Sequence, residues 1–360
     1  MKKQTILPIL IAGGRGTRFW PLSRKNKPKP LLCLGYDQPM ICRACGLLQP
    51  LCSPKNMFIA TSRELAQEIK KVVPDVPEEN FILEPEPRDT APAIGLSLAL
   101  ISRQIRGKTP EPVLAFIPSD QHLENPGEFA KILKLASRLA NEKDMIITIG
   151  VKPEFPATVY GYIEPGKKIP GFKNAFFVKR FKEKPTKTRA REYLKRGFFW
   201  NAGIFIARPA VLWNAFERHL PDYFYSLQKI LDAGARELNS VIKREFSGLK
   251  KISFDYAVME KAENIAVVSG NFGWSDIGGY HSLQRLFQNK RLKNLGVGKL
   301  VHRKSDGILV HSDKLVALVG VKNLAIIETR DALLVMDFSQ EKELKELVRE
   351  LEKIGLEQYL

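Results

Sequence analysis

The sequence lacks any long apolar run. No stretch of its 360 residues approaches the roughly 20 consecutive apolar residues that a helix needs to cross a bilayer. The run from Ile6 to Ala12 follows two lysines and so imitates a signal peptide, but it is short, contains Pro8 and continues into a glycine-rich loop instead of a cleavage site. We therefore expect a buried first strand here, and a cytoplasmic protein that has no membrane partner.

Cysteine is scarce, and all of it lies in one short stretch. Cys33, Cys42, Cys45 and Cys52 are the only cysteines in the chain. Cys42 and Cys45 form a C-x-x-C pair, which can hold a metal, but the second such pair that zinc modules use is missing. We expect a helix over 41–51 that carries these residues as small apolar side chains, and a metal site is the alternative.

Acidic residues are few relative to basic ones. Lys and Arg number 57 against 39 Asp and Glu, which gives a formal net charge of +18. Such an excess favours anionic partners: nucleotides, sugar phosphates, nucleic acid or an acidic membrane surface. The cations are scattered, without the long basic tract or interleaved aromatic residues that single-strand binders use. We therefore expect small phosphorylated substrates and no nucleic-acid partner, although these explain only a few of the charges.

Apolar runs alternate with amphipathic stretches through the first 150 residues. Strands are expected over 6–12, 57–61, 81–83, 113–117 and 145–150, and helices over 39–49, 63–72, 92–103 and 126–141. Strands that alternate with helices predict βαβ units. The expected fold class is therefore α/β, with a doubly wound, mostly parallel, Rossmann-like sheet.

The pattern changes at about residue 158. Short strands over 175–181 and 203–207 flank a charged helical segment near 186–196. This arrangement predicts an inserted, partly antiparallel layer that binds substrate.

After about residue 290 the pattern changes again. Short β-rich runs separated by turn signals cover 308–311, 315–319, 325–328 and 333–336. They predict a small β-helix-like appendage, although no strict repeat can be read. Ser339 could cap a final helix, whose apolar stripe of Leu344, Leu347, Val348 and Leu351 is expected to dock on the same chain or on a partner subunit. We expect a large domain over 1–288 and a small β-rich domain with this terminal helix over 289–360.

The first expected strand ends in Ala12-Gly13-Gly14-Arg15-Gly16-Thr17-Arg18. Glycines in such a loop allow backbone N–H groups to approach phosphate oxygens. The loop matches neither the P-loop pattern G-x-x-x-x-G-K-[ST] nor the dinucleotide pattern G-x-G-x-x-G. Arg18 and Lys29 supply cations, and Lys29 is held between two prolines that stiffen the backbone. Two cations beside a phosphate loop can neutralise a triphosphate and departing pyrophosphate.

This loop, with Pro21-Leu22-Ser23 and Lys29, resembles the signature of the sugar-nucleotide pyrophosphorylases, and most closely that of the mannose-1-phosphate guanylyltransferases. Further segments match in order: Glu84-Pro85 through Thr90-Ala91-Pro92-Ala93-Ile94, Pro118-Ser119-Asp120, Tyr160-Gly161-Tyr162-Ile163, Phe181-Lys182-Glu183-Lys184-Pro185, Trp200 to Phe205, Ser253 to Lys261, and Gly273 to Gly278. The resemblance covers essentially the whole chain. It implies transfer of GMP from GTP to α-D-mannose 1-phosphate, giving GDP-mannose and pyrophosphate, with the catalytic nucleotidyltransferase domain over 1–288.

The implied reaction needs no side-chain base, because the attacking phosphate is already an anion, so alignment and charge neutralisation must supply catalysis. The resemblance gives Arg18 and Lys29 a catalytic role, and gives Mg²⁺, or another divalent cation, to Asp120 and Asp276. It implies that the nucleotide is bound by Gly13, Gly14, Gly16, Thr17, Glu84 and Asp89. It implies that the sugar phosphate is bound by Gly161, Glu183, Lys184, Asn201 and Asp255.

Four positions depart from the family pattern. Gln121 stands where histidine is common, Asp89 where asparagine is usual, Val159 where glycine is frequent and Arg15 where serine is frequent. None of these changes removes an implied phosphate or metal ligand. The change at Asp89 bears on base choice, because donor and acceptor patterns decide which base is bound.

Three questions stay open at this point. A pyrophosphorylase for another nucleotide or hexose phosphate is the first alternative, and a basic nucleic-acid-binding or regulatory protein on the same fold is the second. A homodimer formed through the C-terminal domain is also compatible with the apolar stripe. The isomerase domain that many relatives carry at the C-terminus is not expected here.

Overall fold

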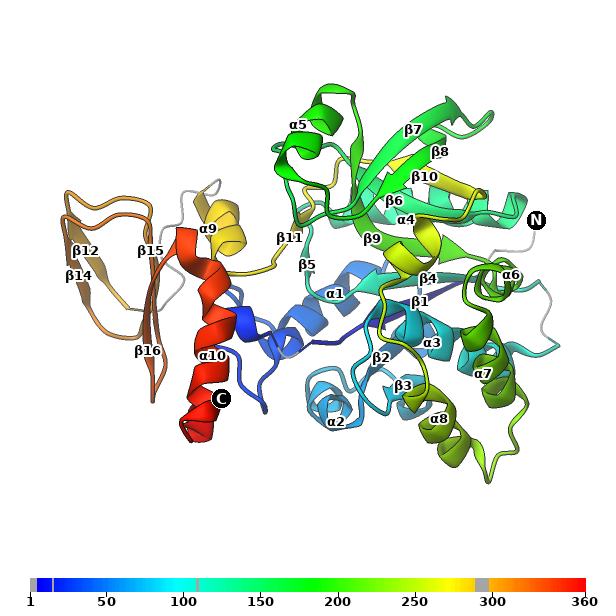
Figure 1. Cartoon of the computed structure of the whole chain (residues 1–360), viewed down its shortest axis with the longest axis horizontal. Helices are drawn as coiled ribbons and strands as arrows, with labels where there is room; N and C mark the ends of the chain where they lie inside the picture. Colours follow the sequence, from blue (N-terminus) through cyan, green and yellow to red (C-terminus); the bar gives the residue numbers. More distant parts are fainter. Residues whose placement is uncertain (1–4, 15, 108–109, 289–297) are drawn as a thin grey trace. The chain divides into compact units, whose positions relative to one another are not determined.

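The computed structural model describes residues 5–14, 16–107, 110–288 and 298–360 (Figure 1). By their contacts the residues form two compact units that do not follow chain order. Unit 1 comprises Met1–Gly13, Ala44–Ser119 and Leu123–Trp274. Unit 2 comprises Gly14–Arg43, Asp120–His122 and Ser275–Leu360. Two segments from the first 122 residues therefore belong to the same unit as the C-terminal part, and a boundary between domains at 288 stays a prediction.

A mixed sheet forms the centre of unit 1. Within the described residues its nine strands run in the order β3 (Phe81–Glu84), β2 (Phe58–Ser62), β1 (Ile6–Ile11), β4 (Val113–Pro118), β9 (Phe199–Ala207), β6 (Ile146–Val151), β10 (Ile265–Ser269), β8 (Ala175–Lys182) and β7 (Tyr162–Lys168). The first four pair in parallel, as do β6 and β10. The strands β7, β8 and β9 pair antiparallel with their neighbours. The predicted α/β class and the predicted antiparallel insertion are both confirmed.

Helices connect and cover these strands. They are α1 (Met40–Leu48), α2 (Arg63–Val72), α3 (Thr90–Ile105), α4 (Pro126–Glu142), α5 (Lys187–Lys195), α6 (Pro209–His219), α7 (Pro221–Asp232) and α8 (Leu238–Ser247). Local chemistry sets several starts: Ser62 caps α2, and Asn125 caps α4 with Pro126 at its first position. The core of the unit buries side chains of β1, β4, α3, α6 and α7 together. No helix in the described part of the chain is long and apolar enough to span a membrane.

Unit 2 contains two small sheets that resemble turns of a β-helix. In one, β12 (Leu300–Arg303) pairs in parallel with β14 (Val316–Val319); in the other, β15 (Leu324–Glu328) pairs in parallel with β13 (Leu309–His311) and antiparallel with β16 (Leu333–Asp337). The partners Leu300 and Val316 are 16 residues apart, and so are Leu309 and Ala325. This constant offset confirms the β-helix-like prediction.

The end of the chain docks on its own unit. Between β16 and α10 (Leu344–Lys353) lies a 3-10 helix, η6 (Phe338–Glu343). Leu344 is buried in one core with Phe19, and two other residues of the predicted stripe pack against that core. The prediction that Ser339 caps the helix is wrong. Asp337 caps η6 instead: its carboxylate accepts a hydrogen bond from the backbone amide of Ser339 at 2.8 Å.

Candidate functional site

The glycine-rich loop follows β1 directly. Gly14 and Gly16 have φ of 93° and 69°, in the left-handed region that favours glycine. A Cβ at Gly16 would stand 2.7 Å from the Lys29 Cβ and 3.1 Å from its backbone nitrogen, so only glycine lets the two segments approach so closely. The Ser23 hydroxyl also donates to the Gly16 carbonyl at 2.7 Å. The sequence therefore builds the loop around Lys29.

Lys29 is nearly buried and paired. It opens the short helix η2 (Lys29–Leu31), which Pro28 caps, and its side chain is only 11% exposed. The Lys29 Nζ lies 2.5 Å from Asp120 Oδ2 and 5.7 Å above the Phe19 ring. A lysine in this position is no solvated surface residue. Its charge is fixed beside one of the two aspartates that the sequence selects for a metal.

A two-residue strand pair brings the second aspartate to the first. The strand β5 (Gln121–His122) pairs antiparallel with β11 (Ser275–Asp276), and Asp276 stands opposite Gln121. Asp120 is the residue directly before β5, so the ladder places the two aspartates at neighbouring positions. The structure thus pairs Lys29 with Asp120 and places the backbone of Asp276 opposite the residue that follows Asp120.

Arg18 approaches the same strand pair. It lies in the short helix η1 (Thr17–Phe19), and its Nη1 donates to the Gly278 carbonyl at 3.0 Å. A Cβ at Gly278 would stand 3.2 Å from Asp276 Oδ2 and 3.4 Å from Arg18 Nη1. Gly278 therefore lets a guanidinium and a carboxylate share one small space. The sequence motif contains this glycine, but its role depends on a contact that only the fold creates.

Sequence reasoning missed a cluster of side chains that contacts β5 through His122. His122 is 2% exposed, and its Nδ1 lies 2.7 Å from the Tyr36 hydroxyl and 3.2 Å from Arg43 Nη2. The Arg43 guanidinium lies 3.4 Å from the centre of the Tyr36 ring, which stacks on the imidazole. Because a guanidinium only donates, Nδ1 must be the acceptor. The cluster fixes the residue two places after Asp120.

The donor set of unit 2 suits a hard divalent cation. Carboxylate oxygens are the ligands that Mg²⁺ takes, and Mg²⁺ is commonly bound by one or two carboxylates, with waters and substrate phosphates completing its shell. Among the described residues no three His, Cys, Asp or Glu side chains form a complete metal site by themselves. Two aspartates fit that shared mode of binding. The four cysteines, all within the described ranges, form no disulfide. The helix expected over 41–51 is α1, which ends at Leu48 and carries Cys42 and Cys45 but neither Cys33 nor Cys52.

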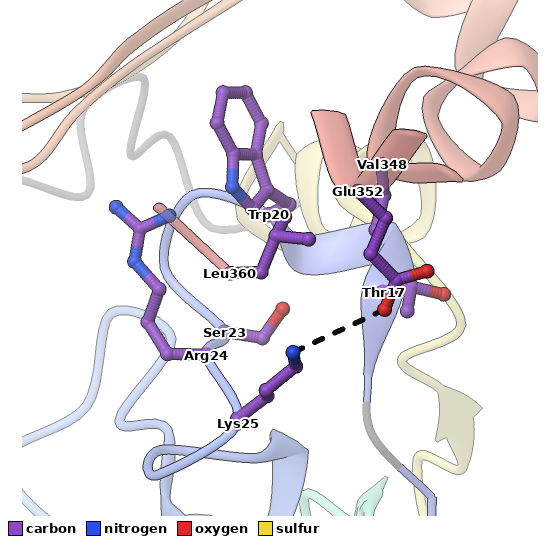
Figure 2. A pocket seen from close by; sticks show the side chains of 8 residues that line it. All are labelled: Thr17, Trp20, Ser23, Arg24, Lys25, Val348, Glu352 and Leu360. Atoms are coloured by element: carbon purple, nitrogen blue, oxygen red, sulfur yellow. Dashed lines mark ion pairs between the residues drawn. The ribbon is translucent and has the colours of Figure 1, made fainter. Parts of the chain in front are cut away.

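Thr17 faces a different part of unit 2. Figure 2 shows its side chain in a pocket that is also lined by Trp20, Ser23, Lys25, Val348 and Glu352. The Lys25 ammonium and the Glu352 carboxylate form an ion pair of 4.0 Å there. The Thr17 side chain thus lines a pocket to which neither Arg18 nor Lys29 contributes.

A second group of predicted residues gathers in unit 1 around Gly161. A Cβ at Gly161 would stand 2.6 Å from Glu183 Oε2 and 3.2 Å from the Asn201 Cβ. The backbone N–H of Asn201 donates a hydrogen bond to the Gly161 carbonyl at 2.9 Å. A larger residue at position 161 would clash with the Glu183 carboxylate, so this position requires glycine. Glu183 is nearly buried, and Lys184 Nζ lies 2.8 Å from its Oε1.

The Asn201 side chain is fixed by three hydrogen bonds. Its Nδ2 donates to Asp255 Oδ1 at 2.8 Å, while its Oδ1 accepts from the Thr148 hydroxyl at 2.8 Å and from the Gly203 amide at 3.2 Å. Asp255 begins the π-helix η5 (Asp255–Met259), so it does not cap that helix. Thr148 is buried on β6 and was not anticipated. The network orients both Asn201 and Asp255.

Charges interact strongly in this group. Burial, followed by the negative charge of Glu183, raises the pKa of Asp255 to about 7. Burial acts to lower the pKa of Lys184, but its hydrogen bond and charge interaction with Glu183 outweigh that effect and raise it. Lys184 thus stays cationic, while Asp255 can change protonation near neutral pH.

The predicted base-binding residues lie at the end of β3 and the start of α3. Glu84 is 7% exposed, and burial raises the pKa of its carboxyl to about 7. Asp89 has φ of 73° and ψ of −176°, a strained combination that non-glycine residues rarely adopt, and its carboxylate accepts from the Thr90 backbone amide at 2.8 Å. Of the other departures, Val159 is 59% exposed and Arg15 lies outside the described residues.

Comparison with known proteins gives consistent matches over the chain. Residues 7–292 match the family model for nucleotidyl transferase, and residues 298–351 match that for the MannoseP isomerase/GMP-like beta-helix domain. Mannose-1-phosphate guanylyltransferase of Escherichia coli K12 is 32% identical over 369 residues, covering 99% of this chain and 75% of the relative. Xanthan biosynthesis protein XanB of Xanthomonas campestris is 31% identical over 356 residues, covering 97% and 74%.

Solved structures agree. A Thermus thermophilus protein described as mannose-1-phosphate geranyltransferase has a TM-score of 0.87 at 33% identity, covering 97% of this chain and 100% of that one. A Helicobacter pylori protein described as mannose-6-phosphate isomerase has a TM-score of 0.60 at 25% identity, covering 76% and 100%. Both units thus have counterparts of known structure.

Proposed function

We propose, from the premise that this chain belongs to the nucleotidyl transferase family and within it to the mannose-1-phosphate guanylyltransferases, that it transfers GMP from GTP to α-D-mannose 1-phosphate. The products are GDP-mannose and pyrophosphate. The observation that carries the proposal beyond family membership is the Lys29–Asp120 ion pair beside Asp276, because cations and carboxylates at a phosphate loop suit phosphoryl chemistry.

The residues of unit 2 would receive the triphosphate. Backbone N–H groups of Gly14 and Gly16, and of Gly13, which ends the first segment of unit 1, would bind phosphate oxygens. Arg18 and Lys29 would neutralise charge on the triphosphate and on departing pyrophosphate. Asp120 and Asp276 would hold Mg²⁺, which when bound supplies Lewis-acid charge neutralisation between the phosphates. The Lys29 Nζ at 2.5 Å from Asp120 fixes that carboxylate in place.

The residues of unit 1 would receive the sugar phosphate. Lys184, kept cationic by Glu183, would contact its phosphate. Glu183 and Asn201 would bind sugar hydroxyls, with Asp255 alongside, because the network around Asn201 presents both donors and acceptors. Gly161 keeps the space beside Glu183 open.

The chemical step is in-line displacement at the α-phosphorus. An oxygen of the sugar phosphate forms the new bond to phosphorus as the bond to pyrophosphate breaks. The nucleophile carries its own charge, so no proton has to be removed and alignment is the main task. Glu84 and Asp89 would face the base, where carboxylates can accept from the N–H groups of guanine.

A matrix of substrates tests this assignment. Turnover is measured as pyrophosphate release with mannose 1-phosphate and with glucose 1-phosphate, each against GTP, UTP, dTTP and ATP. We expect the GTP and mannose 1-phosphate pair to be fastest. Equal or better turnover with UTP or dTTP would remove the guanylyl assignment and favour the alternative of another nucleotide and sugar pair.

The Asp276→Asn variant separates an enzyme from a binding protein. We expect loss of turnover that depends on Mg²⁺, with an unchanged circular dichroism spectrum and melting temperature. Chelation with EDTA should abolish turnover of the wild-type chain, and added Mg²⁺ should restore it. Activity that survives both treatments would rule out the proposed metal role.

The location and assembly of the chain are further proposals. GTP is abundant in the cytoplasm, so the proposed reaction belongs there, and cell fractionation tests this. A homodimer formed through the C-terminal part also stays a prediction. Light scattering on the full chain decides it, since the mass of a monomer at working concentration would exclude the dimer.

A further inference from the structure

Positive charge is concentrated in one segment of this chain. Residues 164–197 contain twelve Lys and Arg but only three Asp and Glu, which gives a net charge of +9. This is half of the net charge of +18 of the whole sequence, carried by less than a tenth of its length. The expectation that the cations are scattered was therefore wrong, and folding makes the imbalance larger.

The segment forms one continuous layer of unit 1. It covers most of the hairpin β7–β8 and the helix α5, drawn in green in Figure 1. The helix packs on the hairpin through Ala190 and Tyr193, which share a core with Tyr162. All residues of the segment are described, and eleven of its twelve cations are exposed, whereas Glu192 is the one exposed acid. We call these eleven exposed cations the basic face.

The other two acids of the segment lie beneath the basic face. Glu164 is 7% exposed and has three cations around its carboxylate: Arg196 at 2.7 Å, with Lys179 and Arg180 each at 3.5 Å. One buried negative charge cannot neutralise three exposed positive ones. Glu183, the second buried acid, is paired with Lys184. The surface seen by a ligand is thus more positive than the sequence count indicates.

The basic face includes one of the residues that are proposed to bind the sugar phosphate. Lys184 is itself a member, and Lys187, the first residue of α5, follows three positions later. Three residues of fully extended chain span at most about 11 Å. This limit is close to the Debye length of about 10 Å at 0.1 M salt, so charges on the first turns of α5 act on an anion at Lys184.

We propose that the basic face steers the dianionic sugar 1-phosphate toward Lys184 and raises its association rate. The proposal rests on the function proposed above, in which Lys184 contacts the sugar phosphate. Clustered charge of one sign around a binding site raises the local concentration of an oppositely charged ligand and its rate of association, and salt screens this effect. The excess positive charge of the chain then has a role in substrate capture.

The test reverses charge on the basic face without touching the proposed binding residues. The double variant Lys187→Glu, Arg191→Glu changes two exposed cations of α5, neither of which has a proposed contact with substrate. The matched control is Lys131→Glu, Lys134→Glu, which makes the same change of net charge on exposed cations of α4. Steady-state kcat and KM for the sugar phosphate are measured at about 20 mM and about 300 mM ionic strength, which spans strong to weak screening.

We expect kcat/KM of the α5 variant to fall roughly three- to ten-fold at low ionic strength, with kcat unchanged, and to converge on the wild-type value at high ionic strength. The α4 control should stay within two-fold of wild type, on the order of what distant charges contribute. An equal loss in both variants would overturn the proposal, because net charge alone would then explain it. A loss that persists at high salt would overturn it too.

Failure of this proposal is distinguishable from failure of the proposed function. The substrate matrix identifies the preferred sugar 1-phosphate first, and the salt series uses that sugar, whichever it is. Wild-type turnover without salt-dependent loss in the α5 variant would contradict steering and leave the enzyme intact. If salt-sensitive binding to anionic vesicles or to single-stranded RNA is lost in the α5 variant while kcat/KM is unaffected, the basic face serves a polyanion and steering is wrong.

Discussion

The Lys29 ammonium lies 2.5 Å from the Asp120 carboxylate, although 91 residues separate them in the sequence. This ion pair joins the segment after the glycine-rich loop to the strand pair that carries Asp276. It is also well shielded, since the lysine side chain is 11% exposed and the aspartate 30%. The attraction between these two charges is stronger than in an exposed ion pair, because water and salt screen it less.

Removing the charge of Lys29 should disable the proposed reaction. In Lys29→Met the triphosphate loses a positioned cation, and Asp120 loses its partner. We expect kcat/KM for GTP to fall about a hundred-fold or more, as for removal of a preorganised electrostatic contact. Steady-state kinetics measures this. The control is Lys25→Met, which breaks an exposed pair of 4.0 Å with Glu352 and should leave turnover unchanged. Equal losses in the two variants would contradict the assignment.

A methyl group at Gly161 should obstruct the sugar side of the site. In Gly161→Ala the new Cβ would stand 2.6 Å from Glu183 Oε2, so the carboxylate must move. We expect KM for the sugar phosphate to rise roughly ten- to hundred-fold, because small displacements of positioning groups are costly. KM for GTP should change little. Gly46→Ala is the control, since Gly46 lies within α1 and, apart from the nearby backbone of its own helix and its chain neighbours, no described atom is within 4 Å of a Cβ there. An unchanged KM for sugar would exclude Glu183 from its binding.

Glu84 should make the chain less stable as pH rises. Burial raises the pKa of its carboxyl to about 7 in the folded chain, above its ordinary value of 4.5. Between about pH 4.5 and 7 the Glu84 carboxyl is protonated in the folded chain and ionised in the unfolded chain. The free energy of unfolding therefore falls as the pH rises through this range. The slope from one such group is at most about 1.4 kcal/mol per pH unit.

Urea unfolding at pH 5, 6, 7 and 8 measures this dependence. Glu84→Gln cannot ionise, so its free energy of unfolding should decline less across the series than that of the wild type. The control is Glu79→Gln, an exposed carboxyl nearby in the chain. If the two variants have the same slope, Glu84 does not carry the effect.

Much of the fold could be predicted from local pattern. Runs such as Ile6 to Ile11 and Ile146 to Val151 are apolar because their strands are buried on both faces, and this signal is visible without the fold. The strand Leu300–Arg303 was missed, because most of its side chains are exposed and it shows no buried run. The start of the last helix was misplaced because a 3-10 helix precedes it, and Asp337 caps that instead.

The candidate site was predictable in part, for a different reason. Arg18, Lys29, Asp120 and Asp276 stand in ordered motifs, so their resemblance to a family selects them. Tyr36 and His122 carry no such signal, since their contact arises from side chains 86 residues apart. The excess of cations over 164–197 can be counted in the sequence, but the burial of Glu164 cannot, because a sequence count treats buried and exposed charges alike.

The stacked cluster beside β5 should control metal affinity. Arg43 donates to His122 and covers the Tyr36 ring, and His122 follows Asp120 by two residues, so Arg43→Met should loosen the strand pair that carries both aspartates. We expect the Mg²⁺ concentration for half-maximal turnover to rise roughly ten-fold, as it does when other residues that orient metal ligands are changed. Mn²⁺ binding followed by electron paramagnetic resonance, with GTP present, should weaken in parallel. Arg138→Met, which removes a guanidinium 4.5 Å from the Phe172 ring, should change neither quantity. If Arg43→Met lowers the melting temperature but leaves Mn²⁺ affinity at the wild-type value, the cluster supports the fold and does not position the aspartates.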